Sequence, residues 1–233
     1  MEGLFVTGTD TGVGKTLAAA ALMHALRARG SSVAGMKPVA SGCEATPAGL
    51  RSPDALALQA RAGGSTPYEL VNPYAFAEPA APHLLAAEAG VSIEPGRIVR
   101  SAETLSAGFD CLVVEGVGGW LVPIGSAATM ADVAEALGLP VVMVVGVRLG
   151  CLNHALLTAE AVRARGLRVA GWVANRLEPG APRAEDNIVA LRERLGAPCL
   201  GVVPPLAAPS AAAAAAYLDL SPLGAVGVGS HAP

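Results

Sequence analysis

Residues 8–16 have the composition and spacing of a loop that binds the phosphates of a nucleotide. The segment reads Gly-Thr-Asp-Thr-Gly-Val-Gly-Lys-Thr and lies between a short apolar run at 4–6 and an alanine-rich stretch at 17–29. Glycines allow successive backbone N–H groups to turn toward a polyphosphate at the positive end of the following helix. In such a loop Lys15 reaches the β- and γ-phosphates, and the Thr16 hydroxyl faces a magnesium ion.

The loop departs from the general pattern at one position. G-x-x-x-x-G-K-[ST] expects glycine at position 9, but Thr9 stands there and Gly8 lies one residue earlier. The alternative is a chance glycine turn before a helix, and the strand–loop–helix context argues against it. We therefore predict a phosphate loop of a particular subtype.

A lysine closes a second apolar run. Lys37 follows Val-Ala-Gly-Met at 33–36 and precedes Pro38 and small residues. At the end of a buried strand its ammonium group would point into an active-site cleft. The alternative is a surface lysine whose aliphatic stem lies along apolar surface while its charge reaches water.

A carboxylate closes a third run, and it could bind a metal. Glu115 follows Cys-Leu-Val-Val at 111–114 and precedes a glycine-rich turn. Magnesium prefers hard oxygen ligands and keeps several waters. Thr16, Glu115 and Asp54 would suffice as its protein ligands. Asp54 is also favoured as an acidic residue at a helix N-terminus, and the two roles are compatible.

Two later segments have features of ligand sites. A helix begins near Gly150, directly after the apolar run at 141–147, and free N–H groups at a helix start suit a carboxylate. Cys151 and His154 also fit a nucleophile and base, although no third group that would orient the base is identifiable. Asn175 offers the donor and acceptor that the edge of adenine requires, or it only forms a turn.

Alternating strands and helices must position these residues. The continuously apolar run at 141–147 indicates a strand buried on both faces, as in parallel sheets. The alternation predicts βαβ units in a single-domain, doubly wound, mostly parallel α/β sheet with helices on both faces, of the P-loop NTPase type. Ligands in such folds bind beyond the carboxyl ends of the strands. The predicted strands are 4–7, 33–37, 111–115, 141–147, 169–175 and 200–203, and the predicted helices are 15–29, 54–62, 95–107, 130–137, 153–165 and 184–195.

The 233 residues suit one domain, with a core at about 3–206 and an alanine-rich C-terminal segment at 207–233. The alanine run at 211–216 predicts a helix. The proline- and glycine-rich stretch at 38–53 is too long for an ordinary connection, and we expect it to be functional.

Composition excludes several classes of protein. Hydrophobic residues make up 52% and charged residues 15%, which indicates a globular rather than a disordered chain. The net charge is −3 without a basic patch, so no nucleic-acid partner is expected. The longest dense apolar run, 140–147, is too short to span a membrane. Because a strand is predicted from residue 4, we expect no signal peptide. Four widely spaced cysteines predict neither zinc nor disulfides, so we expect a reduced, cytoplasmic protein.

Taken together, the motifs strongly resemble those of the dethiobiotin synthetase family. The resemblance runs in order from residue 4 to about residue 206, and this family carries the longer variant of the phosphate loop. The motifs that carry it are Gly8–Thr16, Lys37-Pro38-Val39-x-Ser41-Gly42, Asp54-Ala55, Val114-Glu115-Gly116-x-Gly118-Gly119, Leu149–His154 and Ala174-Asn175.

The resemblance implies a ring closure in biotin biosynthesis that depends on ATP and Mg²⁺. The implied substrate is 7,8-diaminononanoate, a chain with a carboxylate and two adjacent amines. One amine captures CO2, supplied as CO2 or bicarbonate, to form a carbamate. ATP phosphorylates the carbamate to a carbamic–phosphoric anhydride. The second amine then closes the ureido ring with release of ADP and phosphate.

The resemblance also implies roles for individual residues. Lys37 and Lys15 would hold the carbamate and the transferring phosphoryl group, with Ser41 and Thr11 as hydrogen-bonding partners. The implied magnesium ligands are Thr16, Asp54 and Glu115. The implied nucleotide-binding set is Gly12, Val13, Gly14, Lys15, Thr16, Leu17, Asp54, Glu115, Gly116, Val117, Gly118, Asn175, Arg176, Pro204, Pro205 and Leu206. The implied substrate-binding set is Lys37, Ser41, Gly150, Cys151, Leu152 and Asn153, the last four receiving the substrate carboxylate across a homodimer interface.

Three positions depart from the family pattern. Gly12 stands where members often carry glutamate, and Asn187 lies where some use an aromatic residue. No acidic residue lies between Pro204 and Leu218, where some relatives contact the ribose. We expect these differences to affect affinity or nucleotide preference rather than the reaction class.

Other phosphate-loop proteins are the alternatives. Regulatory ATPases of the partitioning and division-site class carry K-G-G-x-G-K-[ST], but here Asp10 stands at the extra lysine and Thr11 at the following glycine. No basic amphipathic C-terminal helix for membrane attachment is predicted either. Amide-forming ligases that take ammonia from a glutaminase need a further domain, for which 233 residues leave no room. A non-enzymatic nucleotide-binding module would leave Lys37 and Ser41 without a role.

Overall fold

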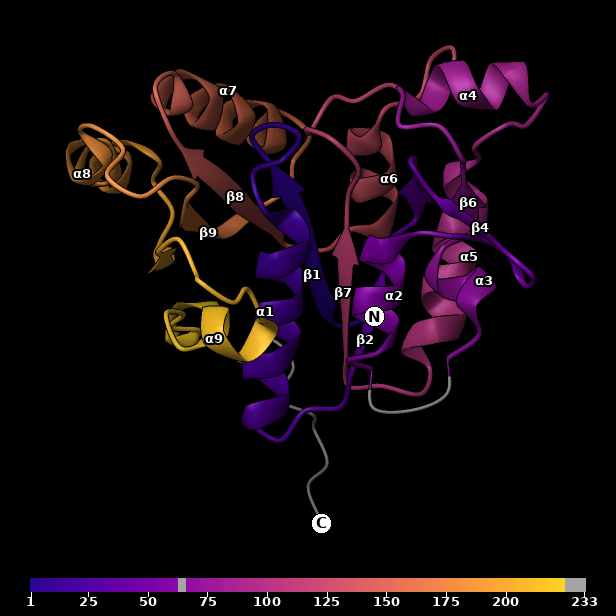
Figure 1. The fold of residues 1–233 in the computed structure, drawn as a ribbon, viewed down its shortest axis with the longest axis horizontal. Helices are drawn as coiled ribbons and strands as arrows, with labels where there is room; N and C mark the ends of the chain where they lie inside the picture. The colour runs from indigo at the N-terminus through magenta and orange to yellow at the C-terminus, as the bar shows by residue number, and fades with distance from the viewer. Residues whose placement is uncertain (63–65, 225–233) are drawn as a thin grey trace.

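Six parallel strands form the central sheet of the computed structural model, which describes residues 1–62 and 66–224. The strand order is β10-β9-β8-β1-β7-β2. The prediction of a doubly wound, mostly parallel sheet is confirmed, and all six predicted strands are present (Figure 1). Their bounds are β1 (Gly3–Gly8), β2 (Val33–Met36), β7 (Cys111–Glu115), β8 (Val141–Val147), β9 (Val169–Arg176) and β10 (Cys199–Val203).

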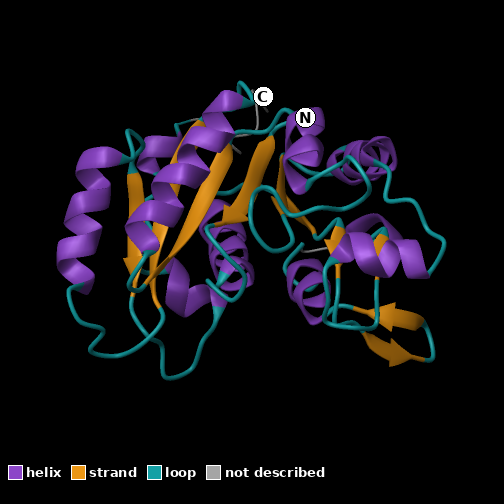
Figure 2. Cartoon of the chain, turned by 90° about the horizontal axis from the view of Figure 1, so that it is seen from above, coloured by secondary structure: helices purple, strands orange, loops and turns teal. Residues whose placement is uncertain are grey.

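Helices cover both faces of the sheet, as Figure 2 shows. On one face α1 (Lys15–Ala28) and α9 (Ala211–Ala215) share a core with Leu4 and Val6 of β1. On the other face lie α5 (Pro95–Ser106), α6 (Met130–Leu137), α7 (Cys151–Ala164) and α8 (Ala184–Arg194), whose core includes Phe5. Successive side chains of a strand point to opposite faces, so consecutive apolar residues are needed to fill both cores.

The sheet brings the predicted site residues to one edge. Strands β7 and β8 flank β1, with Val6 opposite Glu115 on one side and Gly8 opposite Val144 on the other. Parallel strands end at the same edge, so the phosphate loop after β1 lies beside Glu115 at the end of β7. Strand β2 is the terminal strand beyond β7, and it brings Lys37 to the same edge.

Between β2 and β7 the chain forms small elements that periodicity did not predict. Their strands have two or three residues each, which is too few to show an alternating pattern. Strands β3 and β6 pair in parallel, and β4 and β5 form an antiparallel hairpin within the stretch at 38–53. Helix α2 (Pro53–Gln59) follows this hairpin and packs on β2. The bounds of the others are β3 (Val39–Ala40), β4 (Glu44–Thr46), β5 (Gly49–Arg51), α3 (Tyr68–Val71), β6 (Tyr74–Ala75) and α4 (Pro82–Glu88).

Several helix ends differ from the prediction. Helix α7 begins at Cys151, two residues before the predicted start, because Gly150 adopts a left-handed conformation (φ 91°) and the helix follows at once. Helix α2 ends at Gln59 rather than residue 62. The predicted alanine helix is confirmed as α9, whose N-terminus is capped by the Ser210 hydroxyl, and a 3₁₀ turn follows at Ser221–Leu223.

The last part of the alanine-rich C-terminal segment, residues 225–233, lies outside the described residues. Within the residues that are described, we find no helix with the length and apolar character needed to cross a membrane.

Candidate active site

The phosphate loop is shaped by two glycines in the left-handed region. Gly12 has φ 74° and Gly14 has φ 88°, values that L side chains rarely adopt. The Lys15 ammonium folds back over the loop and donates to the backbone oxygen of Asp10 at 2.9 Å. A Cβ atom at Gly14 would lie 2.2 Å from Nδ2 of Asn175, so a larger residue there would force Asn175 or the loop to move.

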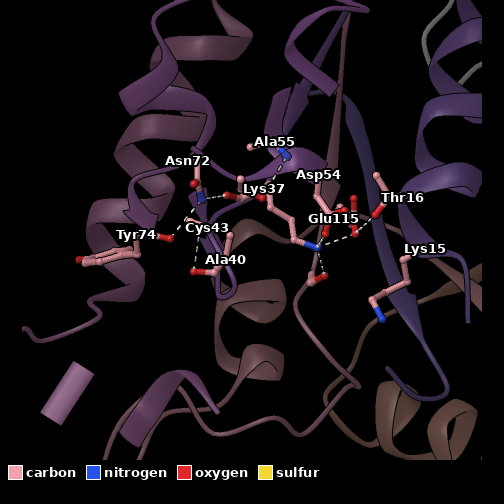
Figure 3. Close-up of polar contacts among 12 residues, drawn as sticks. Lys15, Thr16, Lys37, Ala40, Cys43, Asp54, Ala55, Asn72, Tyr74 and Glu115 are labelled. Carbon is pink, nitrogen blue, oxygen red and sulfur yellow. Dashed lines mark hydrogen bonds and ion pairs between the residues drawn. The ribbon is translucent and has the colours of Figure 1, made fainter. Parts of the chain in front are cut away.

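Opposite the loop, Lys37 forms an ionic cluster with the buried Glu115 and with Asp54, whose side chain is 43% exposed. Its Nζ lies 2.5 Å from Oε1 of Glu115 and 2.9 Å from Oδ2 of Asp54 (Figure 3). The Thr16 hydroxyl donates to the same Glu115 oxygen at 2.8 Å. Glu115 is completely buried, and Lys37 is 3% exposed. Lys37 is therefore not the surface lysine of the alternative interpretation.

Burial and neighbouring charges shift the pKa values of this cluster. Burial alone would lower the pKa of Lys37, but Glu115 and Asp54 raise it above its ordinary value, so the ammonium stays charged. Burial opposes ionisation of Asp54, yet Lys37 holds its pKa below the ordinary value. Burial raises the pKa of Glu115, although Lys37 opposes this shift. Burial, and then the charge of Lys37, lower the pKa of Lys15 to about 8.

The oxygens of the cluster suit a hard cation. Oε2 of Glu115 is buried and has no hydrogen-bond partner among residues 1–62 and 66–224. A buried acceptor without a partner costs free energy, which a bound cation would recover. No group of three or more His, Cys, Asp or Glu side chains in the described residues could hold a metal. The site therefore offers two carboxylates and a hydroxyl, and magnesium characteristically completes its shell with water and substrate phosphates.

A cavity of about 340 Å³ lies between the loop and the lysine cluster. Its volume is in the range of small-molecule sites. It contains the four residues expected to act on the reacting groups, Thr11, Lys15, Lys37 and Ser41. The complete lining is Thr11, Gly12, Gly14, Lys15, Thr16, Lys37, Ala40, Ser41, Asp54, Glu115, Val117 and Gly118.

The other predicted site residues lie outside this lining. Val13 is a buried residue of the loop, Leu17 lies in α1, and Gly116 directly follows β7. Arg176 ends β9 and pairs with Glu185 at 2.8 Å. Pro204, Pro205 and Leu206 follow β10.

Asn175 makes a contact that its strand-end position did not predict. Its Nδ2 donates to the backbone oxygen of Val13 at 2.9 Å, so it supports the phosphate loop directly. The first turn of α7 holds Gly150, Cys151, Leu152 and Asn153 at the end of β8. Cys151 is buried, so its thiol is not accessible to a substrate. This argues against the alternative in which Cys151 is a nucleophile and His154 its base.

Arg148 is a residue of this region that sequence patterns did not single out. Its guanidinium pairs with the Asp10 carboxylate, and the Thr11 N–H donates to the other Asp10 oxygen at 2.7 Å. Arg148 follows β8, 138 positions from Asp10. Because the pair forms only after the sheet assembles, a local motif gives no signal of it.

The fold and the loop are those of the P-loop NTPase class, because a phosphate loop joins the central parallel strand β1 to the helix α1. Among the solved structures with this fold are two MinD structures. The MinC:MinD cell division protein complex of Aquifex aeolicus aligns with a TM-score of 0.56 at 14% identity, covering 89% of this chain and 83% of that chain. The septum site-determining protein MinD of Pyrococcus horikoshii, complexed with Mg-ADP, aligns with a TM-score of 0.52 at 17% identity, covering 87% and 81%.

The chain belongs to the dethiobiotin synthetase family. An ATP-dependent dethiobiotin synthetase BioD of Pseudomonas paraeruginosa is 56% identical over 225 residues, which cover 96% of this chain and 99% of the relative. Proteins of the same name from Xanthomonas oryzae and Cellvibrio japonicus are 53% and 51% identical, and each alignment covers more than nine-tenths of both chains. A family model described as an AAA domain matches residues 2–213. The predicted family is therefore confirmed, whereas the MinD proteins share only the fold.

Proposed function

We propose that this protein catalyses the ATP-dependent closure of the dethiobiotin ring from 7,8-diaminononanoate and CO2, a step of biotin biosynthesis. The names of its relatives support this reaction. The observation that carries the proposal is a cavity lined by two lysines, Lys15 of the phosphate loop and the buried Lys37. A phosphate loop alone would suit any NTPase, but a second buried lysine opposite it suits a second anionic reactant.

The two lysines have complementary tasks in this proposal. A carbamate and a triphosphate repel each other, and cationic side chains that face both reactants offset that repulsion. Lys37 binds the carbamate, and Lys15 binds the transferring phosphoryl group. Ser41 and Thr11 donate hydrogen bonds that orient the reactants. Phosphoryl transfer depends on positioning and charge stabilisation more than on covalent help, which suits this set of residues.

Magnesium is the cation that these oxygens would hold, through Thr16, Asp54 and Glu115. Two observations support this choice: Oε2 of Glu115 is buried and has no hydrogen-bond partner in the described part of the chain, and Asp54 is ionised. When bound, the ion would neutralise charge on the phosphates of ATP.

The base of the nucleotide binds at the ends of β9 and β10 in this proposal. Asn175 donates one N–H to the phosphate loop, and in this proposal its second N–H and its oxygen bind the edge of adenine. Arg176, Pro204, Pro205 and Leu206 complete this part of the site. The residues that hold the phosphates are the loop residues Gly12–Leu17 and the turn at 116–118.

The substrate carboxylate binds at the first turn of α7 in a second copy of the chain. Gly150, Cys151, Leu152 and Asn153 do not line the cavity of their own chain, which favours a role across a homodimer interface. First-turn N–H groups of a helix bind carboxylates readily. Beside them, Leu149 is fully exposed, as expected of a residue that another chain covers.

The experiment that tests the proposal supplies purified protein with diaminononanoate, bicarbonate, ATP and magnesium. We expect dethiobiotin, identified by its mass, and one phosphate released for each ring. Omission of bicarbonate should stop both. If ATP binds normally and no ring product forms, the proposal is wrong.

A further inference from the structure

A ring of polar contacts lies behind the cavity, on the side that carries Lys37. We call it the polar ring, and its members are Lys37, Asp54, Ser52, Tyr68 and Asn72. Lys37 belongs to it at both ends: its ammonium group pairs with Asp54, and its backbone oxygen accepts from the Asn72 amide. Neither Tyr68 nor Asn72 lines the cavity.

The backbone of Lys37 is held from outside the main sheet. Strand β2 is at the edge of the sheet, and its last paired residue is Met36. The Lys37 N–H donates to the Val71 oxygen at 2.8 Å, and its oxygen accepts from Nδ2 of Asn72 at 2.6 Å. The end of α3 therefore sets the point from which this flexible side chain extends.

Asn72 has one possible orientation in this network. The residue is 4% exposed, and its Nδ2 also donates to the Tyr74 backbone oxygen at 3.1 Å. Its Oδ1 accepts from the Tyr68 hydroxyl at 3.0 Å. A rotated amide would turn its oxygen toward two carbonyls, so three contacts fix the group. Figure 3 shows Asn72 against the backbone of Lys37, with Asp54 near the other end of the lysine.

The Tyr68 hydroxyl connects this amide to the helix that carries Asp54. It accepts from the Ser52 N–H at 2.6 Å. Ser52 is the N-cap of α2, and its own hydroxyl accepts from the Ala55 N–H at 3.3 Å. Asp54 lies between these two residues, so the hydroxyl holds the turn from which the Asp54 carboxylate extends.

We propose that Tyr68 and Asn72 are positioning residues that hold Lys37 and Asp54 in the relative placement that ring closure needs. The inference rests on the proposed roles of Lys37 and Asp54. A misplacement of about 1 Å at a reacting group can cost about 100-fold in rate, which makes such a support consequential.

The chain offers a matched pair of substitutions for the test. Tyr68→Phe removes a hydroxyl that accepts from the N–H of Ser52, the N-cap residue of α2. The guanidinium of Arg51 lies 4.1 Å from the centre of the Tyr68 ring. Tyr74→Phe does the same: its hydroxyl accepts from the Glu94 N–H at the start of α5, and Arg97 lies 4.8 Å from its ring. Tyr74 is the more buried of the two, so a loss of stability alone would affect it at least as much.

The first measurement is lysine NMR, because Lys15 and Lys37 are the only lysines in the sequence. Protein labelled with ¹³C-lysine should give two side-chain Cε signals, assigned with Lys15→Arg. We expect Tyr68→Phe to move the Lys37 signal and leave the Lys15 signal in place, and Tyr74→Phe to leave both. Asn72→Ala, which removes the contact to the Lys37 oxygen, should move the Lys37 signal as well.

The second measurement is the rate of ring closure. We expect Tyr68→Phe to lower kcat by about 10- to 100-fold while the KM for ATP changes less than about threefold. Tyr74→Phe should keep kcat within about twofold, with melting temperatures of both variants measured alongside.

Two results would overturn the inference: an unmoved Lys37 signal in both Tyr68→Phe and Asn72→Ala, or equal kcat for the two tyrosine variants of an active enzyme. A wild-type protein that makes no ring product would contradict the proposed function instead. In that case the NMR comparison still decides whether the polar ring positions Lys37.

Discussion

The phosphate loop at 8–16 and the opposite wall of the cavity are stabilised by different kinds of contact. We call the first the phosphate wall and the second, formed by Lys37, Ala40, Ser41 and Asp54, the lysine wall. The phosphate wall is one continuous segment whose course depends on two glycines with positive φ. The lysine wall combines residues from the end of β2, from β3 and the turn after it, and from α2. A polar network holds the backbone of Lys37 and the start of the helix that carries Asp54.

The difference bears on the specificity that we propose for the site. The MinD structures share the fold of this chain at 14% and 17% identity, and that likeness extends to the fold alone. The feature that suits a second anionic reactant is the lysine wall. Glu115 joins the two, because its Oε1 accepts from Thr16 on one side and from Lys37 on the other.

The broadest expected effect is impairment of both turnover and nucleotide binding when this joint is changed. Glu115→Gln removes the charge that faces a buried ammonium and, in our proposal, a magnesium ligand. We expect turnover to fall by about 100- to 1,000-fold and nucleotide affinity to lose most of its dependence on magnesium. Magnesium titrations of nucleotide binding provide the measurement. Glu135→Gln, which changes a surface partner of Arg165, is the control, and an unchanged magnesium titration in Glu115→Gln would remove Glu115 from the metal shell.

A second prediction concerns the phosphate wall alone. Gly14→Ala places a Cβ 2.2 Å from the Asn175 amide at a residue with φ 88°. We expect nucleotide affinity to weaken by about 10- to 100-fold, with much smaller loss of kcat at saturating ATP. Gly166→Ala is the control, because Gly166 also has a positive φ (71°) but has open space around it. It reports the effect of backbone strain at a position away from the site. Equal affinity in the two variants would contradict the proposed support of the loop by Asn175.

The third prediction uses the pKa of Lys15, which burial and then Lys37 lower to about 8. Phosphates bind the protonated lysine, so nucleotide affinity should fall by about tenfold between pH 7 and pH 9. For folding the sign is opposite. The native pKa lies below the ordinary 10.5, so the destabilisation from Lys15 is largest below pH 8 and diminishes as pH rises to 10.5.

Calorimetric titrations of nucleotide across this pH range test the prediction. Lys15→Arg keeps its charge throughout, so its affinity should not fall over the same range. A wild-type profile as flat as that of the arginine variant would exclude titration of Lys15.

The smallest expected effect comes from the ion pair that links the phosphate wall to Arg148. Both side chains are more than two-fifths exposed, and exposed pairs contribute about 0–1 kcal/mol. Asp10→Asn keeps an oxygen for the Thr11 N–H, so nucleotide affinity should change by less than about fivefold, and salt should reduce the difference. A larger, salt-independent change would mean that the phosphate wall depends on the Asp10–Arg148 pair as well as on the contact from Asn175.

Local sequence predicted the phosphate wall and the frame of the fold well. Strands β7 and β8 begin and end as predicted, because their apolar runs are bounded by charged, glycine or proline residues. Lys37 and Glu115 were predictable as strand-end residues, since parallel strands bring their carboxyl ends to one edge.

The support of the lysine wall could not be predicted in the same way. Asn72 and Tyr68 lie 35 and 16 positions from the residues they hold, and neither belongs to a periodic pattern. A buried polar residue is recognised only when its partners are known. The contact of Asn175 with Val13 was missed for the same reason, because it spans 162 positions.

The division of tasks between the two walls is tested most directly on Lys37→Ala, by measuring nucleotide affinity and ring closure in one preparation whose folding is checked by thermal unfolding. We predict that ring closure falls by about 1,000-fold or more while the Kd for nucleotide stays within about threefold of wild type. Equal loss of both would contradict the account, because Lys37 would then serve nucleotide binding or the fold rather than the second reactant.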